Sequence, residues 1–278
     1  MSASSNGDGF SGQVALVTGA SSGAGRSIAL ALAARGASVC LAGRDAGRLE
    51  EVATKAASGG GKSIAHVVDL TRDEDLRVLA ERVVGELGSL DLLVHAAGVM
   101  APGRVQDSAL PDLDRQYQTN LRAPYALTQL LLPSLREGRG QIVFINSTQG
   151  AAASPEASQY AATKHGLRAV ADGLRAEVNR DGMRVLTVLL GQTATPMQEG
   201  LHKAQGRRYQ PELMIQPGDV AEMVIGALLV ARTAEVTEFR MLPASPPDAD
   251  SGGRGADSLL VSVPLSIASY GQFVQAAF

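Results

Sequence analysis

Near its start the chain reads Thr18-Gly19-Ala20-Ser21-Ser22-Gly23-Ala24-Gly25. This glycine-rich turn follows a short apolar run over residues 14–18, which predicts a buried strand, and it opens a helix-period segment over residues 25–35. Glycines permit a tight turn. The backbone N–H groups of such a turn can approach a phosphate at a helix N-terminus, where the helix dipole favours an anion. Such a glycine triplet also occurs in ordinary turns, so its interpretation depends on the surrounding elements.

Beyond the turn, apolar runs and helix-period segments continue to alternate. The predicted strands are rich in Val, Ile and Leu on both faces, and they span residues 14–18, 38–42, 63–69, 90–95, 141–146, 183–190 and 235–241. The predicted helices span roughly residues 25–35, 46–57, 73–87, 108–136, 159–180 and 219–231, with Asp219 as the N-cap of the last. This alternation predicts an α/β fold, with a parallel sheet of about seven strands and helices on both faces. Ligands bind such a sheet beyond the carboxyl ends of its strands.

Composition excludes several classes of protein. With 45% hydrophobic and 19% charged residues among 278, the chain is neither disordered throughout nor collagen-like. Its net charge of −3 gives no reason to expect a nucleic-acid partner. The single cysteine, Cys40, excludes an intrachain disulfide and a cysteine-cluster zinc site, and we assign none of the four histidines to a metal. Without a signal peptide or a bilayer-length apolar segment, we expect a soluble cytoplasmic protein with no membrane contact.

A second pattern concerns chemistry. Tyr160 and Lys164 lie four residues apart on a predicted helix, so their side chains share one face. An ammonium near a phenol favours the phenolate and moves its pKa from about 10 toward neutral pH. Such pairs are common on helices, but Ser147 stands thirteen positions earlier, at the carboxyl end of a predicted strand.

Together with His95-Ala96-Ala97-Gly98 after the fourth predicted strand, these features resemble the short-chain dehydrogenase/reductase family, in its shorter-chain branch. The spacing G-x-x-x-G-x-G matches that family rather than the commonest dinucleotide fingerprint, G-x-G-x-x-G. The resemblance covers residues 13–242 and implies a Rossmann-type doubly wound sheet. The chain departs from the family pattern at His95-Ala96, where Asn-Asn is frequent, and at Leu190, where a proline is usual.

The resemblance also implies a nicotinamide dinucleotide cofactor. An NAD site usually ends the second strand with an acid, whereas an NADP site supplies positive charge. Here Gly43 takes the place of the acid, and Arg44 matches the arginine of NADP-preferring members, whose guanidinium suits a phosphate; Arg44 as an ordinary surface charge is the alternative. We interpret Asp45 as a helix N-cap and expect NADP(H), with NAD(H) as the alternative. The implied cofactor-binding residues are Gly19, Ser21, Ser22, Gly23, Ala24, Gly25, Arg44, Asp69, Leu70, Ala97, Gly98, Tyr160, Lys164, Gly191, Thr193 and Thr195.

By the same resemblance, the catalytic residues are Asn120, Ser147, Tyr160 and Lys164. Ser147 would orient a substrate carbonyl, Tyr160 would give its proton to the oxygen, and Lys164 would bind the nicotinamide ribose and lower the pKa of Tyr160. Asn120 would hold a water that links Lys164 to solvent. We interpret His95 as a satisfied histidine at a strand end rather than a catalytic base.

The expected function is therefore NADP(H)-dependent reduction of a carbonyl, or oxidation of a secondary alcohol. Candidate substrates are a 3-oxoacyl thioester, a ketone or aldehyde, a sugar or a steroid-like alcohol. A non-catalytic NADP-binding regulator or scaffold is the main alternative, and an epimerase or dehydratase of the longer-chain branch is a weaker one. Residues 196–216 would form a substrate lid, where Arg207 and Arg208 meet either an anionic substrate or only solvent.

The resemblance also bears on domains and assembly. We expect a flexible N-terminus over residues 1–12, one NAD(P)-binding domain with the catalytic site over residues 13–242, and a linker-like tail over residues 243–278. Helices around residues 108–136 and 159–180 would form the interface of a homo-oligomer, a dimer or a homotetramer.

Overall fold

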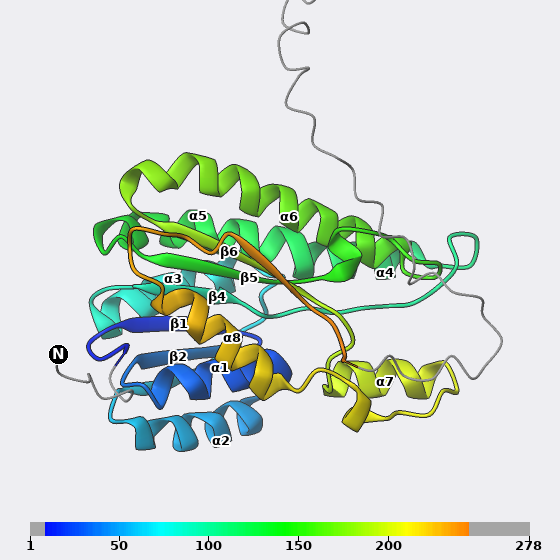
Figure 1. The fold of residues 1–278 in the computed structure, drawn as a ribbon, viewed down its shortest axis with the longest axis horizontal. Coiled ribbons are helices and arrows are strands. Elements are labelled where there is room, and N and C mark those ends of the chain that lie inside the picture. Colours follow the sequence, from blue (N-terminus) through cyan, green and yellow to red (C-terminus); the bar gives the residue numbers. More distant parts are fainter. Residues whose placement is uncertain (1–8, 245–278) are drawn as a thin grey trace, which may run out of the picture. The chain divides into compact units, whose positions relative to one another are not determined.

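Seven parallel strands form one sheet in the order β3-β2-β1-β4-β5-β6-β7 (Figure 1). The computed structural model describes residues 9–244; residues 1–8 and all of the expected tail beyond Ala244 lie outside the described residues. The strands are β1 (Val14–Thr18), β2 (Ser38–Gly43), β3 (Ser63–Val67), β4 (Leu92–His95), β5 (Gln141–Ser147), β6 (Arg184–Leu190) and β7 (Glu238–Met241). The predicted α/β class and doubly wound Rossmann-type sheet are confirmed.

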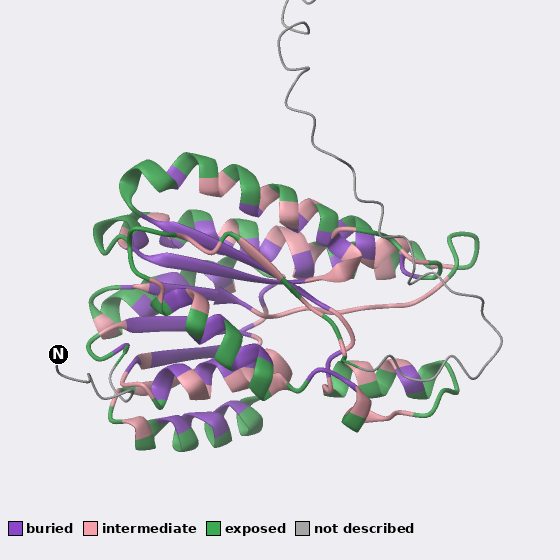
Figure 2. Cartoon of the chain, in the orientation of Figure 1, coloured by how far each residue is buried: buried purple, intermediate pink, exposed green. Residues whose placement is uncertain are grey.

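Helices cover both faces of the sheet. They are α1 (Gly23–Ala33), α2 (Ala46–Ala56), α3 (Asp73–Leu87), α4 (Leu110–Tyr117), α5 (Ala123–Glu137), α6 (Ser158–Val178), α7 (Pro196–Ala204) and α8 (Pro217–Leu229). Alternate residues of β1 supply both cores: Ala15 and Val17 pack with α1, α2 and α8, whereas Val14 and Leu16 pack with α3, α5 and α6. Figure 2 shows the central strands β1, β4, β5 and β6 buried between the two helical layers, whereas the outer strands β3 and β7 are only partly buried.

The strand order places the ligand crevice. β1 pairs with β2 on one side and β4 on the other, with Thr18 opposite Ala42 and His95 respectively. The chain turns away in opposite directions after these strands, so a crevice opens at the carboxyl ends of β1 and β4. The glycine turn and the loop after β4 both lie there.

The predicted helix over residues 108–136 is divided into three segments. α4 and α5 are separated by a π-helical turn, Gln118–Arg122. Pro124 in the first turn of α5 has no N–H to donate, which is consistent with the irregular hydrogen bonding just before it. The irregularity that Pro124 suggested is therefore present, and it places Asn120 in the π-helical turn.

Other features also differ from the prediction. The N-cap of α8 is Gln216, not Asp219, because Pro217 occupies the first helical position and moves Asp219 into the first turn. The folded part begins before Gln13, because Phe10 is fully buried and its N–H donates to the Arg35 carbonyl. Within the expected lid, α7 is an additional helix. None of the helices between residues 9 and 244 is long and apolar enough to cross a membrane.

Candidate active site

A cleft of about 490 Å³ opens at the carboxyl ends of the strands. All sixteen residues that the sequence predicts at a cofactor line this cleft, and so does Ser147. Asn120 does not line it; it lies behind the wall. The fold thus brings together residues that are up to 176 positions apart (Gly19 to Thr195).

The glycine turn is held tightly against the loop after β4. Gly19 has φ +66°, and a Cβ on it would lie 2.7 Å from the backbone of Ala97. A Cβ on Gly25 would lie 2.5 Å from the Gly19 carbonyl oxygen. The N-cap of α1, Ser22, makes no side-chain capping bond, and the first turn of α1 carries no acid. The backbone N–H groups at this helix end therefore suit a phosphate, which is the group expected there.

The end of β2 carries the residues expected to choose the cofactor. Arg44 is exposed and lines the cleft. Asp45 caps α2, since its Oδ1 accepts a hydrogen bond from the Arg48 N–H at 3.0 Å, as predicted. Just after the neighbouring strand β3, hydrogen bonds from the hydroxyl and N–H of Thr71, with a smaller contribution from Arg44, lower the pKa of Asp69. Asp69 is therefore charged at neutral pH.

Ser147, Tyr160 and Lys164 meet where β5 ends and α6 begins. The Lys164 side chain is buried, its Nζ donates to the Ile145 carbonyl at 3.0 Å, and it lies 5.7 Å from the centre of the Tyr160 ring. Ser147 Oγ accepts from the Gln149 N–H at 3.1 Å, so its own hydrogen remains to be donated, either to Tyr160 or to a substrate oxygen. These contacts hold the three side chains in one part of the cleft.

The titration of this group differs from the sequence prediction. Burial raises the pKa of Tyr160 to about 12, partly offset by its hydrogen bond with Ser147. Without a nicotinamide in the cleft, the pKa of Tyr160 is therefore above its ordinary value, because burial penalises the phenolate; its lowering beside Lys164 and an oxidised nicotinamide stays a prediction. Burial also lowers the pKa of Lys164, to about 8.

Asn120 contacts the backbone rather than the cleft. Its Oδ1 accepts from the Val99 N–H at 2.8 Å, and its Nδ2 donates to the Val99 carbonyl at 2.9 Å and to Thr163 Oγ1 at 3.1 Å. The side chain thereby ties the loop after β4 to α6. Through these contacts Asn120 positions the loop after β4 against α6, and its role in holding a water stays a prediction.

His95 is a satisfied core histidine, as predicted. Its Nε2 lies 2.9 Å from Thr128 Oγ1, and its ring stacks on Phe144 with 5.0 Å between centres. Burial lowers the pKa of His95 to about 3. Among residues 9–244, no group of three or more His, Cys, Asp or Glu side chains is placed to hold a metal ion.

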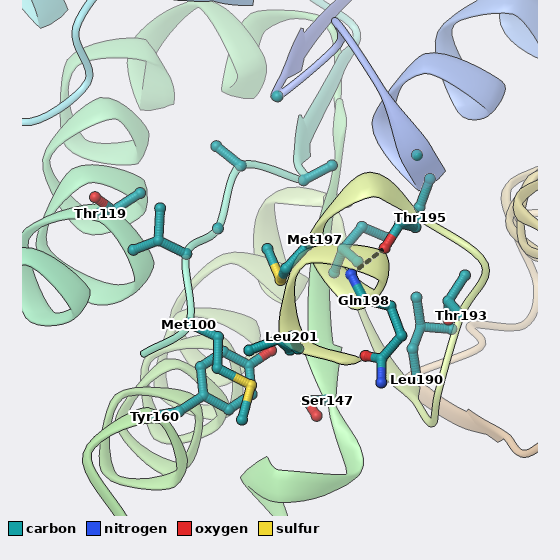
Figure 3. A pocket seen from close by; sticks show the side chains of 18 of the residues that line it. Met100, Thr119, Ser147, Tyr160, Leu190, Thr193, Thr195, Met197, Gln198 and Leu201 are labelled. Carbon is teal, nitrogen blue, oxygen red and sulfur yellow. Dashed lines mark hydrogen bonds between the residues drawn. The ribbon is translucent and has the colours of Figure 1, made fainter. Parts of the chain in front are cut away.

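The lid contributes residues that sequence reasoning missed. Figure 3 shows Met197 and Leu201 on the side of α7 that faces Tyr160 and Met100. Thr195 caps α7 by accepting from the Gln198 N–H at 3.3 Å. The pattern Thr-Pro-x-Gln at residues 195–198 is a helix start that could have predicted α7. The cleft-lining residues missed from the sequence include Met100, Gln149, Glu156, Met197, Gln198, Leu201 and Gln205.

In sequence and in structure, the chain is similar to known dehydrogenases and reductases. A family model described as short chain dehydrogenase matches residues 13–206. An uncharacterized oxidoreductase of Staphylococcus saprophyticus is 30% identical over 233 residues, which are 83% of this chain and 97% of that protein. An alcohol dehydrogenase from the archaeon Thermococcus sibiricus, complexed with 5-hydroxy-NADP, is 25% identical with a TM-score of 0.77, covering 85% of this chain and 99% of its own. An actinorhodin polyketide ketoreductase variant with NADPH is 28% identical with a TM-score of 0.77, and the match covers 85% of this chain and 98% of that protein.

Proposed function

The chain belongs to the short-chain dehydrogenase family and is an oxidoreductase of that family, and from this premise we propose that it uses NADP(H) to reduce a carbonyl compound or to oxidise the corresponding secondary alcohol. One observation carries the proposal. Ser147, Tyr160 and Lys164 share a cleft with a glycine turn whose backbone approach leaves no room for a Cβ at Gly19. A nucleotide-binding end and a proton-donating end thus lie in one site.

The residues fit NADP(H). The N-terminus of α1 and the turn Gly19–Gly25 would hold the pyrophosphate, and Arg44 would pair with the 2′-phosphate where an NAD site usually has an acid. Asp69 and Leu70 would flank the adenine, and Lys164 with the loop after β6 would hold the nicotinamide end. Two similar solved structures contain NADPH or an NADP derivative, which supports the same choice here. When bound, the nicotinamide supplies a hydride from its C4.

The side chains divide the remaining chemistry. Ser147 Oγ donates a hydrogen bond to the substrate carbonyl oxygen and orients it, and Tyr160 donates the proton that this oxygen gains as hydride reaches the carbon. Because the pKa of Tyr160 is raised to about 12, the phenol is protonated at neutral pH and is ready to act as an acid. The Lys164 ammonium stabilises the phenolate that remains and can return a proton to it. These states favour reduction.

A carbonyl screen tests the proposal. Purified protein should oxidise NADPH with at least one aldehyde or ketone of a structurally varied panel, measured by loss of absorbance at the nicotinamide band. Ser147→Ala should lose about 10²-fold or more of that rate and retain NADPH binding. Wild-type protein that binds NADPH tightly yet reduces nothing in the panel would instead support the non-catalytic regulator or scaffold.

We also propose that the protein is a homo-oligomer, a dimer or a tetramer. Large apolar side chains are exposed on the predicted interface segments, among them Leu110 at 71%, Tyr117 at 46% and Tyr125 at 49%. An oligomer interface formed by these segments would remove such side chains from water. Light scattering should give a mass of two or four times 28.7 kDa, and a particle of 28.7 kDa at micromolar concentration would contradict it.

A further inference from the structure

The half of the cleft beyond Ser147 and Tyr160 has a distinct chemistry. Its walls come from the loop after β4, the loop between β5 and α6, and the lid, and most lining side chains there are thioethers, amides or aliphatic: Met100, Gln149, Met197, Gln198, Leu201 and Gln205. Two charged side chains join them, Glu156 and Arg207. Arg44 and Asp69 belong to the opposite end, at the carboxyl ends of β2 and β3.

The backbone at Arg207 is held in place by the end of α7. Gly206 takes the left-handed conformation, with φ +63°, and the Arg207 N–H donates to the His202 carbonyl at 2.8 Å. His202 is buried, and its ring meets the Tyr209 ring edge-on with 5.7 Å between centres. The hydrogen bond and the ring contact thus hold the loop that follows α7 against the end of the helix. As a result Arg207 lines the cleft, whereas Arg208 does not.

Arg207 also has no charge partner within residues 9–244: none of the ion pairs there, and none of the side-chain hydrogen bonds, involves its guanidinium. The other cation on this side, Lys164, is bonded to the Ile145 carbonyl. A guanidinium offers a planar fork of donors that matches a carboxylate or phosphate in two parallel hydrogen bonds. Arg207 is therefore the cation that remains for a substrate.

We propose that Arg207 forms an anion subsite in the substrate half of the cleft, so that the substrates are ketones or aldehydes that carry a carboxylate or phosphate away from the reacting carbonyl. This inference rests on the proposed function. Substrate anion and Arg207 attract each other, while Ser147 and Tyr160 hold the carbonyl oxygen. These two sets of contacts, one at the anion and one at the carbonyl oxygen, hold both ends of the substrate beside the nicotinamide.

Glu156 offers Arg207 a different partner. It is exposed on the loop between β5 and α6, has φ +63°, and its carbonyl accepts from the Gly103 N–H at 2.8 Å. This loop is braced by Gln149, whose side chain bonds both the N–H and the hydroxyl of Ser154, at 2.9 and 2.7 Å. Movement of the lid toward this wall would let Glu156 pair with Arg207, and the experiment must separate the two cases.

The experiment compares acids with their uncharged esters. Reduction of 4-oxopentanoate and 5-oxohexanoate is measured against their methyl esters, and dihydroxyacetone phosphate against dihydroxyacetone, with NADPH. Wild-type protein should favour at least one charged member of these pairs by about tenfold or more in kcat/KM. Arg207→Gln should remove that preference through a higher KM for the charged member, with the Kd for NADPH unchanged. Arg208→Gln is the matched control and should behave as wild type. The carboxylate and phosphate pairs identify which anion is used.

Other results overturn the inference. Wild-type preference for every uncharged member, equal losses in Arg207→Gln and Arg208→Gln, or an equal loss of the charged member in Glu156→Gln would each exclude the subsite. If no carbonyl compound is reduced, the proposed function fails independently. The subsite is then decided by binding: equilibrium dialysis of 4-oxopentanoate and of dihydroxyacetone phosphate with NADPH-loaded protein should show weaker binding of one of them to Arg207→Gln than to Arg208→Gln. Equal binding to both variants would overturn it.

Discussion

The ammonium of Lys164 lies 5.7 Å from the centre of the Tyr160 ring, one turn along the same helix. Lys164 Nζ is fixed there by the Ile145 carbonyl of β5, so the separation depends on how α6 packs against the sheet. Burial acts on both groups in the direction that favours the neutral form, raising the pKa of the phenol and lowering that of the ammonium. Both groups carry their protons at neutral pH.

The proton donor is tested by Tyr160→Phe. The variant should lose about 10²–10⁴-fold in kcat, because the proton-donating hydroxyl is the only group removed, and should bind NADPH as wild type does. Tyr125→Phe is the control, since Tyr125 is half exposed on α5. Steady-state rates and fluorescence titration of NADPH measure the two effects. Activity of Tyr160→Phe close to that of Tyr125→Phe would remove Tyr160 from the reaction.

The charge of Lys164 predicts a pH profile. With a pKa of about 8, lowered by burial, Lys164 is protonated below that pH and neutral above it. The kcat for reduction should therefore be level between pH 6 and 7.5 and fall about tenfold per unit well above pH 8. Lys164→Gln should be slow throughout and lack this step. A wild-type rate that stays level to pH 10 would contradict the assignment.

Cofactor choice is tested at the end of β2. Arg44→Ala should weaken NADPH about 10- to 100-fold and leave NADH nearly unchanged, because only NADPH carries the 2′-phosphate. Arg48→Ala is the matched control, since Arg48 is also exposed but is paired with Asp45. Dissociation constants for both cofactors give the answer. Equal weakening of NADPH and NADH by Arg44→Ala would exclude the phosphate contact.

The glycine turn is tested by Gly19→Ala. The added Cβ would meet the Ala97 backbone at 2.7 Å in a left-handed conformation, so unfolding should require at least about 2 kcal/mol less free energy and NADPH binding should be lost. Gly60→Ala is the control that separates backbone strain from steric clash. Gly60 also has a left-handed φ, +88°, but a Cβ added to it would have no neighbouring atom within 4 Å. It should cost only about 1 kcal/mol and keep NADPH binding. Urea unfolding and NADPH titration measure both, and equal effects in the two variants would show that the close approach to Ala97 is unimportant.

His95 predicts a pH dependence of stability. Its pKa is lowered from 6.5 to about 3 by burial, so the unfolded chain binds a proton that the folded chain excludes. The contribution to stability is complete above pH 6.5 and is lost progressively as the pH falls from 6.5 toward 3. Between pH 7.5 and 5.5 wild type should lose about 1.4 kcal/mol more unfolding free energy than His95→Asn. Urea unfolding measures these free energies. Equal losses of unfolding free energy in wild type and His95→Asn would show that protonation of His95 does not affect stability.

Much of the site followed from short patterns. The glycine turn after β1 and the Tyr160–Lys164 pair are short patterns, the strand-helix alternation repeats along the chain, and all the predicted cofactor residues line one cleft. The boundary errors have equally local causes, such as Pro217 displacing Asp219 from the N-cap. The π-helical turn at Asn120 was suggested only by Pro124.

Order along the chain was enough to predict the parallel sheet, the glycine turn and the candidate catalytic side chains, because strand-helix alternation, turn residues and shared helix faces are readable from local patterns. Burial and distant contacts lie beyond such patterns, since they arise from every element packed around a residue. Packing of α6 on β5 raised the pKa of Tyr160, the loop after β4 engaged Asn120, and the end of α7 placed Arg207, not Arg208, along the cleft.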